Sequence, residues 1–63
     1  MNVSVDDLRA FWGEKRHQEL QHIAVASGVP VGTVINVVRG RTKHPRMDTF
    51  TKLAAEYERQ RAA

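Results

Sequence analysis

Residues 20–39 read LQHIAVASGVPVGTVINVVR, and the first half of this stretch has the pattern of a short helix with a defined end. Apolar or small residues recur in it at helical spacing, namely Leu20, Ile23, Ala24 and Ser27. Gly28 then supplies the residue best able to adopt a positive φ just beyond a helix end. The pattern predicts a helix over about residues 19–27 that stops at Gly28.

The second half of the stretch predicts another short helix. Pro30 is favourable at a helix start, because its φ is already fixed and its missing N–H would have no partner there. The run Val34–Val38 is rich in β-branched residues, which are typical of strands. Gly28 and Gly40 nevertheless bound this run at helical length, so we expect a helix over about 31–39 that is closed by Gly40.

Periodicity divides this second helix into two faces. At about 100° per residue, three valines share the face that we expect to pack on the domain: Val34, Val37 and Val38. The opposite face carries Gly32, Ile35, Asn36 and Arg39, with Val31 at its margin. It contains neither Glu nor Lys and leaves an isoleucine unprotected. Such a mixture suits a surface that is buried when a partner binds.

The N-terminal flank predicts a further helix. Ser4, followed by Asp7, has the pattern of an N-cap with an acidic residue in the first turn. We expect this helix over about 5–16, weakened at Gly13, with a turn or helix end within residues 14–18.

The C-terminal flank predicts a fourth helix. A basic loop over 41–46 precedes an apolar stripe at helical spacing, formed by Met47, Phe50, Leu53, Ala54 and Tyr57. We expect the helix over about 48–59, with a frayed tail over 60–63. Because no strand of useful length is present, the expected fold class is all-α: a compact bundle of four or five short helices forming one domain over residues 1–63.

Length and composition limit the class of protein. A chain of 63 residues is enough for one domain with a small core. It has no cysteine, so it offers neither a disulfide framework nor thiolate ligands for zinc. Its N-terminus lacks a basic start followed by an apolar run, and no stretch approaches the roughly 20 apolar residues of a membrane span. We therefore expect a soluble intracellular protein with no membrane partner.

Charge is distributed unevenly along the chain. Residues 20–47 contain no acidic residue, and their basic residues are Arg39, Arg41, Lys43 and Arg46; the flanks hold all seven acidic residues. Because phosphates repel carboxylates, this distribution indicates a polyanionic partner. Chance clustering in a basic loop is the alternative explanation.

The sequence offers no pattern for catalysis or metal binding. His17, His22 and His44 do not share one helical face and have no second type of ligand nearby. No nucleophile–base set, carboxylate pair in a pocket or phosphate-cradling glycine loop is present. We therefore expect no enzyme activity, no cofactor and no small-molecule ligand. The aromatic residues are more typical of a core than of a single-strand binding platform: Phe11, Trp12, Phe50 and Tyr57.

The outward face of the 31–39 helix has chemistry suited to a DNA major groove. Asn36 can pair with the edge of adenine, and Arg39 can pair with guanine or with a phosphate. The methyl groups of Val31 and Ile35 can pack on the methyl group of thymine. Gly32 would allow close approach. A solvated polar residue is the alternative interpretation of Asn36.

Residues 20–39 also resemble a helix-turn-helix unit of the lambda-repressor/Cro superfamily. In that pattern a small residue lies where the two helices cross, here Ala24, and a glycine makes the turn, here Gly28. Apolar residues occupy the other scaffold positions: Ile23, Val29, Val34 and Val37. Residues 29–38 resemble the lac-repressor headpiece as well, and residues 40–54 resemble the basic loop, proline and following helix of phage-repressor and Cro-type domains. The resemblance covers about residues 19–57.

This resemblance implies a small transcriptional repressor that binds a palindromic operator in double-stranded DNA, in the cytoplasm of a bacterium or a phage-infected host and associated with the nucleoid. The 31–39 helix would be its recognition helix. Expected base contacts are Val31, Gly32, Ile35 and Asn36; expected base or phosphate contacts are Thr33 and Arg39; expected phosphate contacts are Gln21, Arg41, Lys43, His44 and Arg46. The chain differs from the common pattern at Pro30, Val31 and Gly32, which replace a Ser or Thr cap and a polar pair.

A homodimer is expected, because one short helix specifies too few base pairs to select a site in a genome. Two copies would bind half-sites about 34 Å apart. The dimer surface is expected on the fourth helix with its tail, or on exposed apolar residues of the first helix such as Trp12. The alternative function is a protein-interaction module of the same fold, in which Val31 and Ile35 dock a partner helix. Such docking should survive high salt, unlike phosphate contacts.

Overall fold

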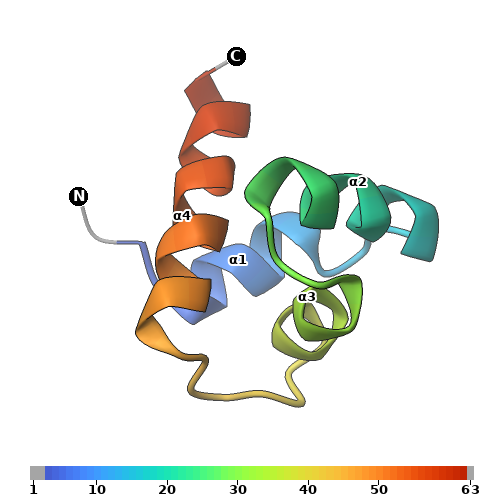
Figure 1. Cartoon of the computed structure of the whole chain (residues 1–63). Helices are drawn as coiled ribbons and strands as arrows, with labels where there is room; N and C mark the ends of the chain where they lie inside the picture. Colours follow the sequence, from blue (N-terminus) through green and yellow to red (C-terminus); the bar gives the residue numbers. More distant parts are fainter. Residues whose placement is uncertain (1–2, 63) are drawn as a thin grey trace.

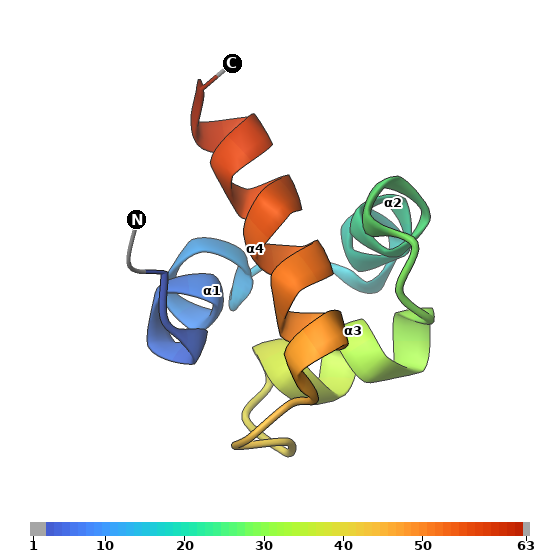
Figure 2. The ribbon, with the colours of Figure 1, turned by 60° about the vertical axis from the view of Figure 1, so that its left-hand side comes forward.

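The computed structural model describes residues 3–62, which form four α-helices and no strand (Figure 1). The helices are α1 (Val5–Trp12), α2 (His17–Ser27), α3 (Val31–Val38) and α4 (Met47–Ala62). The expected all-helical fold class is thereby confirmed for these residues. Figure 2 shows α4 between α1 and α2, with α3 crossing below them.

α1 begins at a capping box and ends sooner than the sequence predicted. Ser4 Oγ accepts a hydrogen bond from the Asp7 N–H at 3.2 Å, and Asp7 Oδ2 accepts one from the Ser4 N–H at 2.9 Å. The helix ends at Trp12 instead of continuing to residue 16. The longer prediction was wrong because residues 13–19 contain no apolar side chain that could hold a further turn on the core.

The turn Gly28–Pro30 joins α2 to α3. Gly28 has a φ of 76°, and the N–H groups of Gly28 and Val29 both donate to the carbonyl oxygen of Ala24, at 2.9 and 3.1 Å. The two helices on either side of the turn are bent by 116° relative to each other. The predicted stop at Gly28 is confirmed, whereas α2 begins at His17 rather than at residue 19.

The core draws side chains from all four helices and from the turn. It consists of Leu8, Trp12, Leu20, Ile23, Ala24, Val29, Val34, Val37, Val38, Leu53 and Tyr57. Trp12 is fully buried, and its ring packs edge to face against that of Tyr57, with the two ring centroids 6.2 Å apart. The expectation that Trp12 forms an exposed dimer surface is therefore wrong. Phe11, expected in the core, is instead the exposed aromatic residue of α1, with 41% of its surface accessible.

α4 is longer than predicted at both ends. It spans Met47–Ala62, whereas the apolar stripe predicted residues 48–59 followed by a frayed tail. Gln60 holds the last turns in place: its Oε1 accepts a hydrogen bond from the indole of α1 at 3.0 Å, and its Nε2 donates to Glu56 Oε2 at 2.7 Å. The predicted fraying is wrong for residues 60–62, and Ala63 lies outside the described residues.

Within residues 3–62, no single helix has the length and apolar composition needed to cross a membrane. α2 and α3 reach that length and composition only together, and they are sharply bent at the turn between them. Both helices also supply buried side chains to the core.

Candidate nucleic-acid interface

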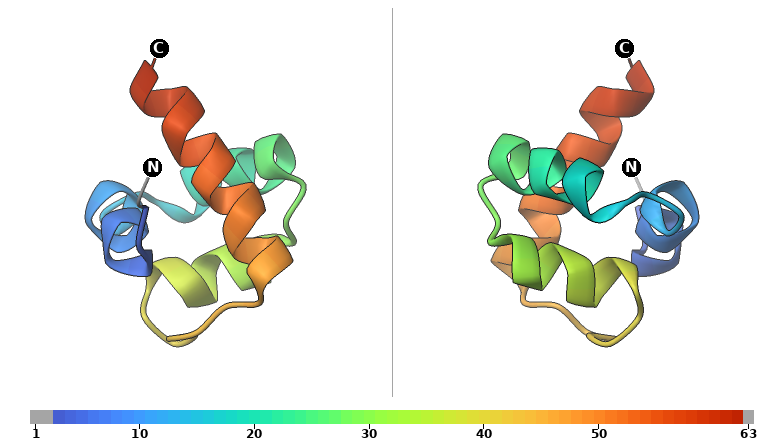
Figure 3. Two further views of the ribbon diagram at one scale, coloured as in Figure 1. Left: turned by 90° about the vertical axis from the view of Figure 1, so that its left-hand side faces the viewer. Right: turned by 90° about the vertical axis from the view of Figure 1, so that its right-hand side faces the viewer.

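α3 and the loop over 39–46 lie together at one end of the molecule, opposite the C-terminus of α4 (Figures 1 and 3). The predicted inward face of α3 is confirmed, since its three valines are buried: Val34, Val37 and Val38. Gly32 and Arg39 on the other side are exposed. The side of α3 that is exposed at this end of the molecule is therefore the one opposite these three valines.

Two apolar residues of α3 are less exposed than the sequence indicated. Val31 and Ile35 are half-buried, and both pack against the core. Ile35 lies about 100° from Val34 around the helix axis, at the border between the inward and outward faces. The prediction of an unprotected isoleucine is therefore wrong, and only part of each side chain remains accessible to a partner.

Asn36 and Thr33 supply the polar side chains of this surface. Both are half-buried, and neither side chain makes a hydrogen bond within residues 3–62. Neither side chain has a polar atom that is both buried and without a hydrogen bond. Within residues 3–62 the one such atom is Oε1 of Glu58, in α4. The hydrogen-bonding groups of Asn36 and Thr33 are therefore accessible to solvent and free to bind an external partner.

The fold does not require a glycine at position 32. It lies inside α3 without a positive φ, and a Cβ atom built on it would meet no heavy atom within 4 Å. A side chain at this position would project only into the space outside the protein. Gly32 therefore leaves the backbone near the start of α3 open to close approach from outside.

The chain folds back on α3 where the helix ends. Arg39 is the C-cap, with φ −91° and ψ 3°, and Gly40 follows with a φ of 83°. The N–H groups of Arg41 and Thr42 then donate to the carbonyl oxygen of Asn36, at 2.8 and 3.0 Å. The helix thus stops one residue before the predicted end, and the basic loop begins against its last turn.

Arg9 of α1 connects this loop to the rest of the fold. Its Nε donates to the carbonyl oxygen of Val37 at 3.2 Å, and its Nη2 donates to that of Thr42 at 3.3 Å. Its Nη1 pairs with Asp6 Oδ1 at 3.3 Å. Sequence reasoning missed this role, because the spacing of Asp6 and Arg9 predicts an ion pair within α1 but gives no sign of contacts with the distant loop.

The cations of the loop are not neutralised within the described chain. The basic side chains of this segment are all exposed: Arg39, Arg41, Lys43, His44 and Arg46. Over residues 3–62 none of them forms an ion pair; the ion pairs there are Asp6–Arg9, Lys15–Glu19 and Glu56–Arg59. Positive charge is therefore concentrated at the end of the molecule that α3 occupies.

Gln21 is the one predicted contact that lies on neither α3 nor the loop. It is exposed on α2. At about 100° per residue it lies on the side of α2 away from Glu19 and Ala26, which line a groove with α4.

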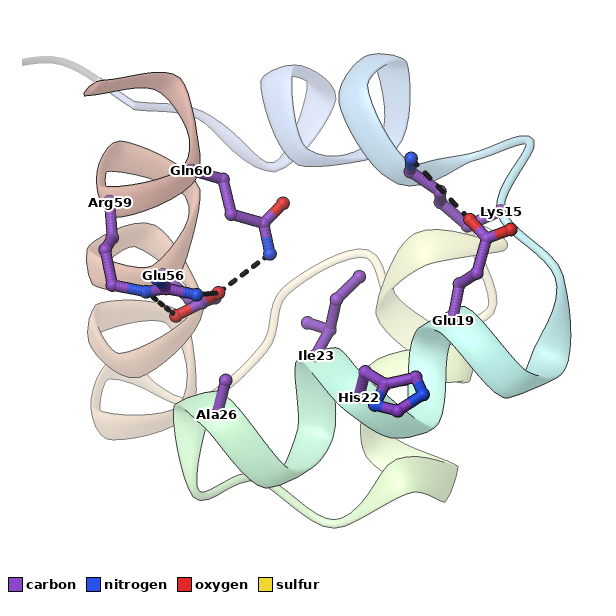
Figure 4. Close-up of a pocket in the computed structure, with 8 residues that line it drawn as sticks. All are labelled: Lys15, Glu19, His22, Ile23, Ala26, Glu56, Arg59 and Gln60. Atoms are coloured by element: carbon purple, nitrogen blue, oxygen red, sulfur yellow. Dashed lines mark hydrogen bonds and ion pairs between the residues drawn. The ribbon is translucent and has the colours of Figure 1, made fainter. Parts of the chain in front are cut away.

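The groove between α2 and α4 has a different electrostatic character (Figure 4). It has a volume of about 400 Å³, and its floor includes the buried carboxylate of Glu56. Arg59 donates to this carboxylate from Nε at 2.8 Å and from Nη2 at 2.5 Å, and Gln60 donates to it as well. The Arg59 hydrogen bonds hold the pKa of Glu56 below its usual value against the opposing effect of burial. Each charge of this network is compensated inside the groove, unlike those of the loop.

The three histidines do not converge. In the part of the chain that the structure describes, no group of three His, Cys, Asp or Glu side chains is placed to hold a metal ion. His22 lines the α2–α4 groove and His44 lies in the basic loop.

Comparison of the chain with family models, with curated proteins and with solved structures finds no match.

Proposed function

We propose that this protein is a sequence-specific binder of double-stranded DNA that uses α2, the turn Gly28–Pro30 and α3 as a helix-turn-helix unit. In this proposal α3 lies in the major groove, and the loop over 39–46 contacts the sugar-phosphate backbone. The observation that carries the proposal is the position of this loop next to α3. The cations of the loop form no ion pair within residues 3–62, and the exposed side of α3 has free polar groups and no acidic residue.

The relation between α2 and α3 supports this assignment. Helix-turn-helix units join two helices at roughly 90–120° through a short turn that often contains glycine. The bend of 116° and the glycine in the left-handed conformation fit that description. Ala24 is buried in α2 next to this turn, and its small side chain is compatible with a close crossing of the two helices.

The charge arrangement supports a phosphate partner. Cations that have no internal carboxylate partner gain most from the phosphates of a duplex, where they displace condensed counterions. Arg9 holds the backbone on both sides of Gly40, so the loop is attached to the helix that would enter the groove. Base-reading groups and phosphate-binding groups would then approach the duplex as one rigid surface.

We further propose that the protein acts as a dimeric repressor on a palindromic operator. α3 has 8 residues and is about 12 Å long, which spans only three or four base pairs at roughly 3.4 Å each. Two copies on half-sites about 34 Å apart would give a site of useful specificity. Phe11 and the outward face of α4 remain available for the contact between copies. Occlusion of a promoter is the simplest action of such a dimer, by analogy with small phage-type repressors.

Selection from a randomised duplex library, with the winners rebound at two salt concentrations, tests the proposal. We expect an enriched palindrome whose affinity falls steeply with salt. The variant Lys15→Ala is the matched control, because this cation is paired with Glu19 and lines the α2–α4 groove, outside α3 and the basic loop. Its salt dependence should equal that of the unmodified protein. Absence of enrichment together with absence of salt-sensitive binding would overturn the proposal.

A protein-docking function is the second candidate, and one observation favours it. Met47 is 79% exposed at the start of α4, beside a groove of about 350 Å³ whose apolar lining includes Val5, Pro45 and Phe50. The docking pair that the sequence suggests, Val31 and Ile35, is less suitable because both side chains pack against the core. Binding through the Met47 groove would persist at high salt and would be lost in Met47→Ser.

A further inference from the structure

The surface that α3 presents carries hydrogen-bonding side chains of only two kinds. These are the amide of Asn36 and the hydroxyl of Thr33, both free of hydrogen bonds within residues 3–62. No cation lies within α3 itself, since Val31–Val38 contains neither Lys nor Arg. The helix therefore has no side chain of the type that most commonly reads guanine.

Arg39 is the one cation whose role the sequence left open between a base and a phosphate. The structure places it after the last helical residue, as a C-cap with non-helical backbone angles. It is about 12 Å along the axis from Val31, at 1.5 Å per residue. Recognition helices contact base edges mainly with their N-terminal residues. Arg39 therefore belongs with Arg41 and the loop cations, on the side of the phosphates.

The apolar groups of α3 favour one kind of base edge. Val31 and Ile35 are half-buried, so each offers part of a branched side chain while the rest is held by the core. Thr33, between them in sequence, adds another methyl group. In the major groove, the apolar feature that distinguishes one base pair from another is the 5-methyl group of thymine. Rigid, partly exposed methyl groups are suited to pack against it.

Asn36 completes this preference. Its amide offers a donor and an acceptor side by side, which match N7 and the 6-amino group of adenine. Gly32 adds no side chain that would keep the start of α3 away from the floor of the groove. The polar and the apolar parts of the surface thus point to the same base pair.

We propose that the half-site contacted by α3 consists of A·T pairs, with Asn36 on an adenine, the methyl groups of Val31 and Ile35 against thymine, and Arg39 on a phosphate. This inference rests on the proposed function, because it requires α3 to lie in the major groove. It goes further by naming the base composition of the site and by assigning Arg39 to the backbone.

Chemically altered duplexes of the selected site test the inference. Replacement of a single thymine by uracil removes only the 5-methyl group, and we expect about a fourfold loss of affinity at each contacted thymine, equivalent to roughly 0.8 kcal/mol per buried carbon. Replacement of the contacted adenine by 7-deazaadenine removes N7 and should weaken binding by the unmodified protein. Selected half-sites of G·C pairs, or indifference to both replacements, would overturn the inference.

Two variants assign the contacts to residues. Asn36→Ala should lose about 5- to 140-fold on the selected site, equivalent to roughly 1–3 kcal/mol, and should become indifferent to 7-deazaadenine. Arg39→Ala should weaken binding to every duplex alike and leave the preferred sequence unchanged. If Arg39→Ala instead abolishes discrimination at a G·C pair, Arg39 reads a base and the inference is wrong. Thermal unfolding of each variant reports whether its fold is retained.

The same measurements separate this inference from the proposed function. Salt-sensitive binding to a site that contains guanine in the α3 contacts would overturn only the A·T assignment. Absence of salt-sensitive binding to any duplex would remove the proposed function and the inference together.

Discussion

Arg9 of α1 donates a hydrogen bond from its Nε to the carbonyl oxygen of Val37, at 3.2 Å, where α3 ends. This contact puts a cation at the negative end of the α3 dipole, and the same guanidinium holds Thr42 in the basic loop. The orientation of the loop relative to α3 therefore depends on a residue of another helix, which does not belong to the proposed DNA contacts.

Replacement of Arg9 should weaken DNA binding without removing a DNA contact. Arg9→Met keeps the aliphatic stem but loses the hydrogen bonds to Val37 in α3 and to Thr42 in the loop, which should lower the free energy of unfolding by about 1–2 kcal/mol. Affinity for the selected site should fall while the salt slope stays unchanged, because the number of phosphate contacts is the same. Arg9→Lys should restore part of the affinity. A reduced salt slope in Arg9→Met would mean that Arg9 itself contacts phosphate.

Gly32→Ala should change stability and DNA affinity in opposite directions. Alanine inside a helix is favoured over glycine by roughly 0.5–1 kcal/mol, and the new methyl group meets no atom of the protein. It projects instead toward the proposed groove, so affinity should fall although the melting temperature rises. The control is His22→Ala, an exposed residue of α2 in the α2–α4 groove, which should leave affinity unchanged. Full affinity in Gly32→Ala would contradict insertion of the start of α3 into the groove.

Arg41→Ala and Lys43→Ala should weaken binding to specific and random duplexes alike. Each removes an exposed cation without an internal partner, so each should reduce the slope of log K against log salt by about 0.9. Binding titrations over a series of salt concentrations measure this slope. A slope equal to that of the unmodified protein would exclude the replaced residue from the phosphate contacts.

The Glu56–Arg59 network should make folding stability sensitive to acid. The pKa of Glu56 is lower in the folded chain than its usual value of 4.5, chiefly because Arg59 donates to the carboxylate. Its contribution is therefore fully present above about pH 4.5 and is lost as the pH falls through the lowered folded value. Glu56→Gln should cost about 1–3 kcal/mol at pH 7 and less near pH 3. Thermal unfolding at the two pH values checks this, and an equal difference at both would contradict it.

The sequence predicted those parts of the fold that local residues control. Gly28, Pro30 and Gly40 define the limits of the central helices, because each restricts the backbone at its own position. The inward valines of α3 followed from periodicity alone. The DNA-binding function that the resemblance to a helix-turn-helix unit implies stays a prediction.

The features that the sequence did not predict depend on contacts between distant residues. α4 extends beyond its apolar stripe because Gln60 reaches Trp12, and Arg9 reaches the loop from another helix. Ile35 is half-buried because its position at the border of two faces is decided by what packs beside it. Spacing within one element contains no information on these neighbours.

Trp12, buried and hydrogen-bonded to Gln60, is the single tryptophan of the chain. Its indole therefore acts as an intrinsic fluorophore at the junction of α1 and α4. Release of α4 would expose the ring to water and shift its emission to longer wavelength, whereas occupation of the α3 surface would leave this environment unchanged. One optical signal thus monitors unfolding separately from DNA association for every variant described above.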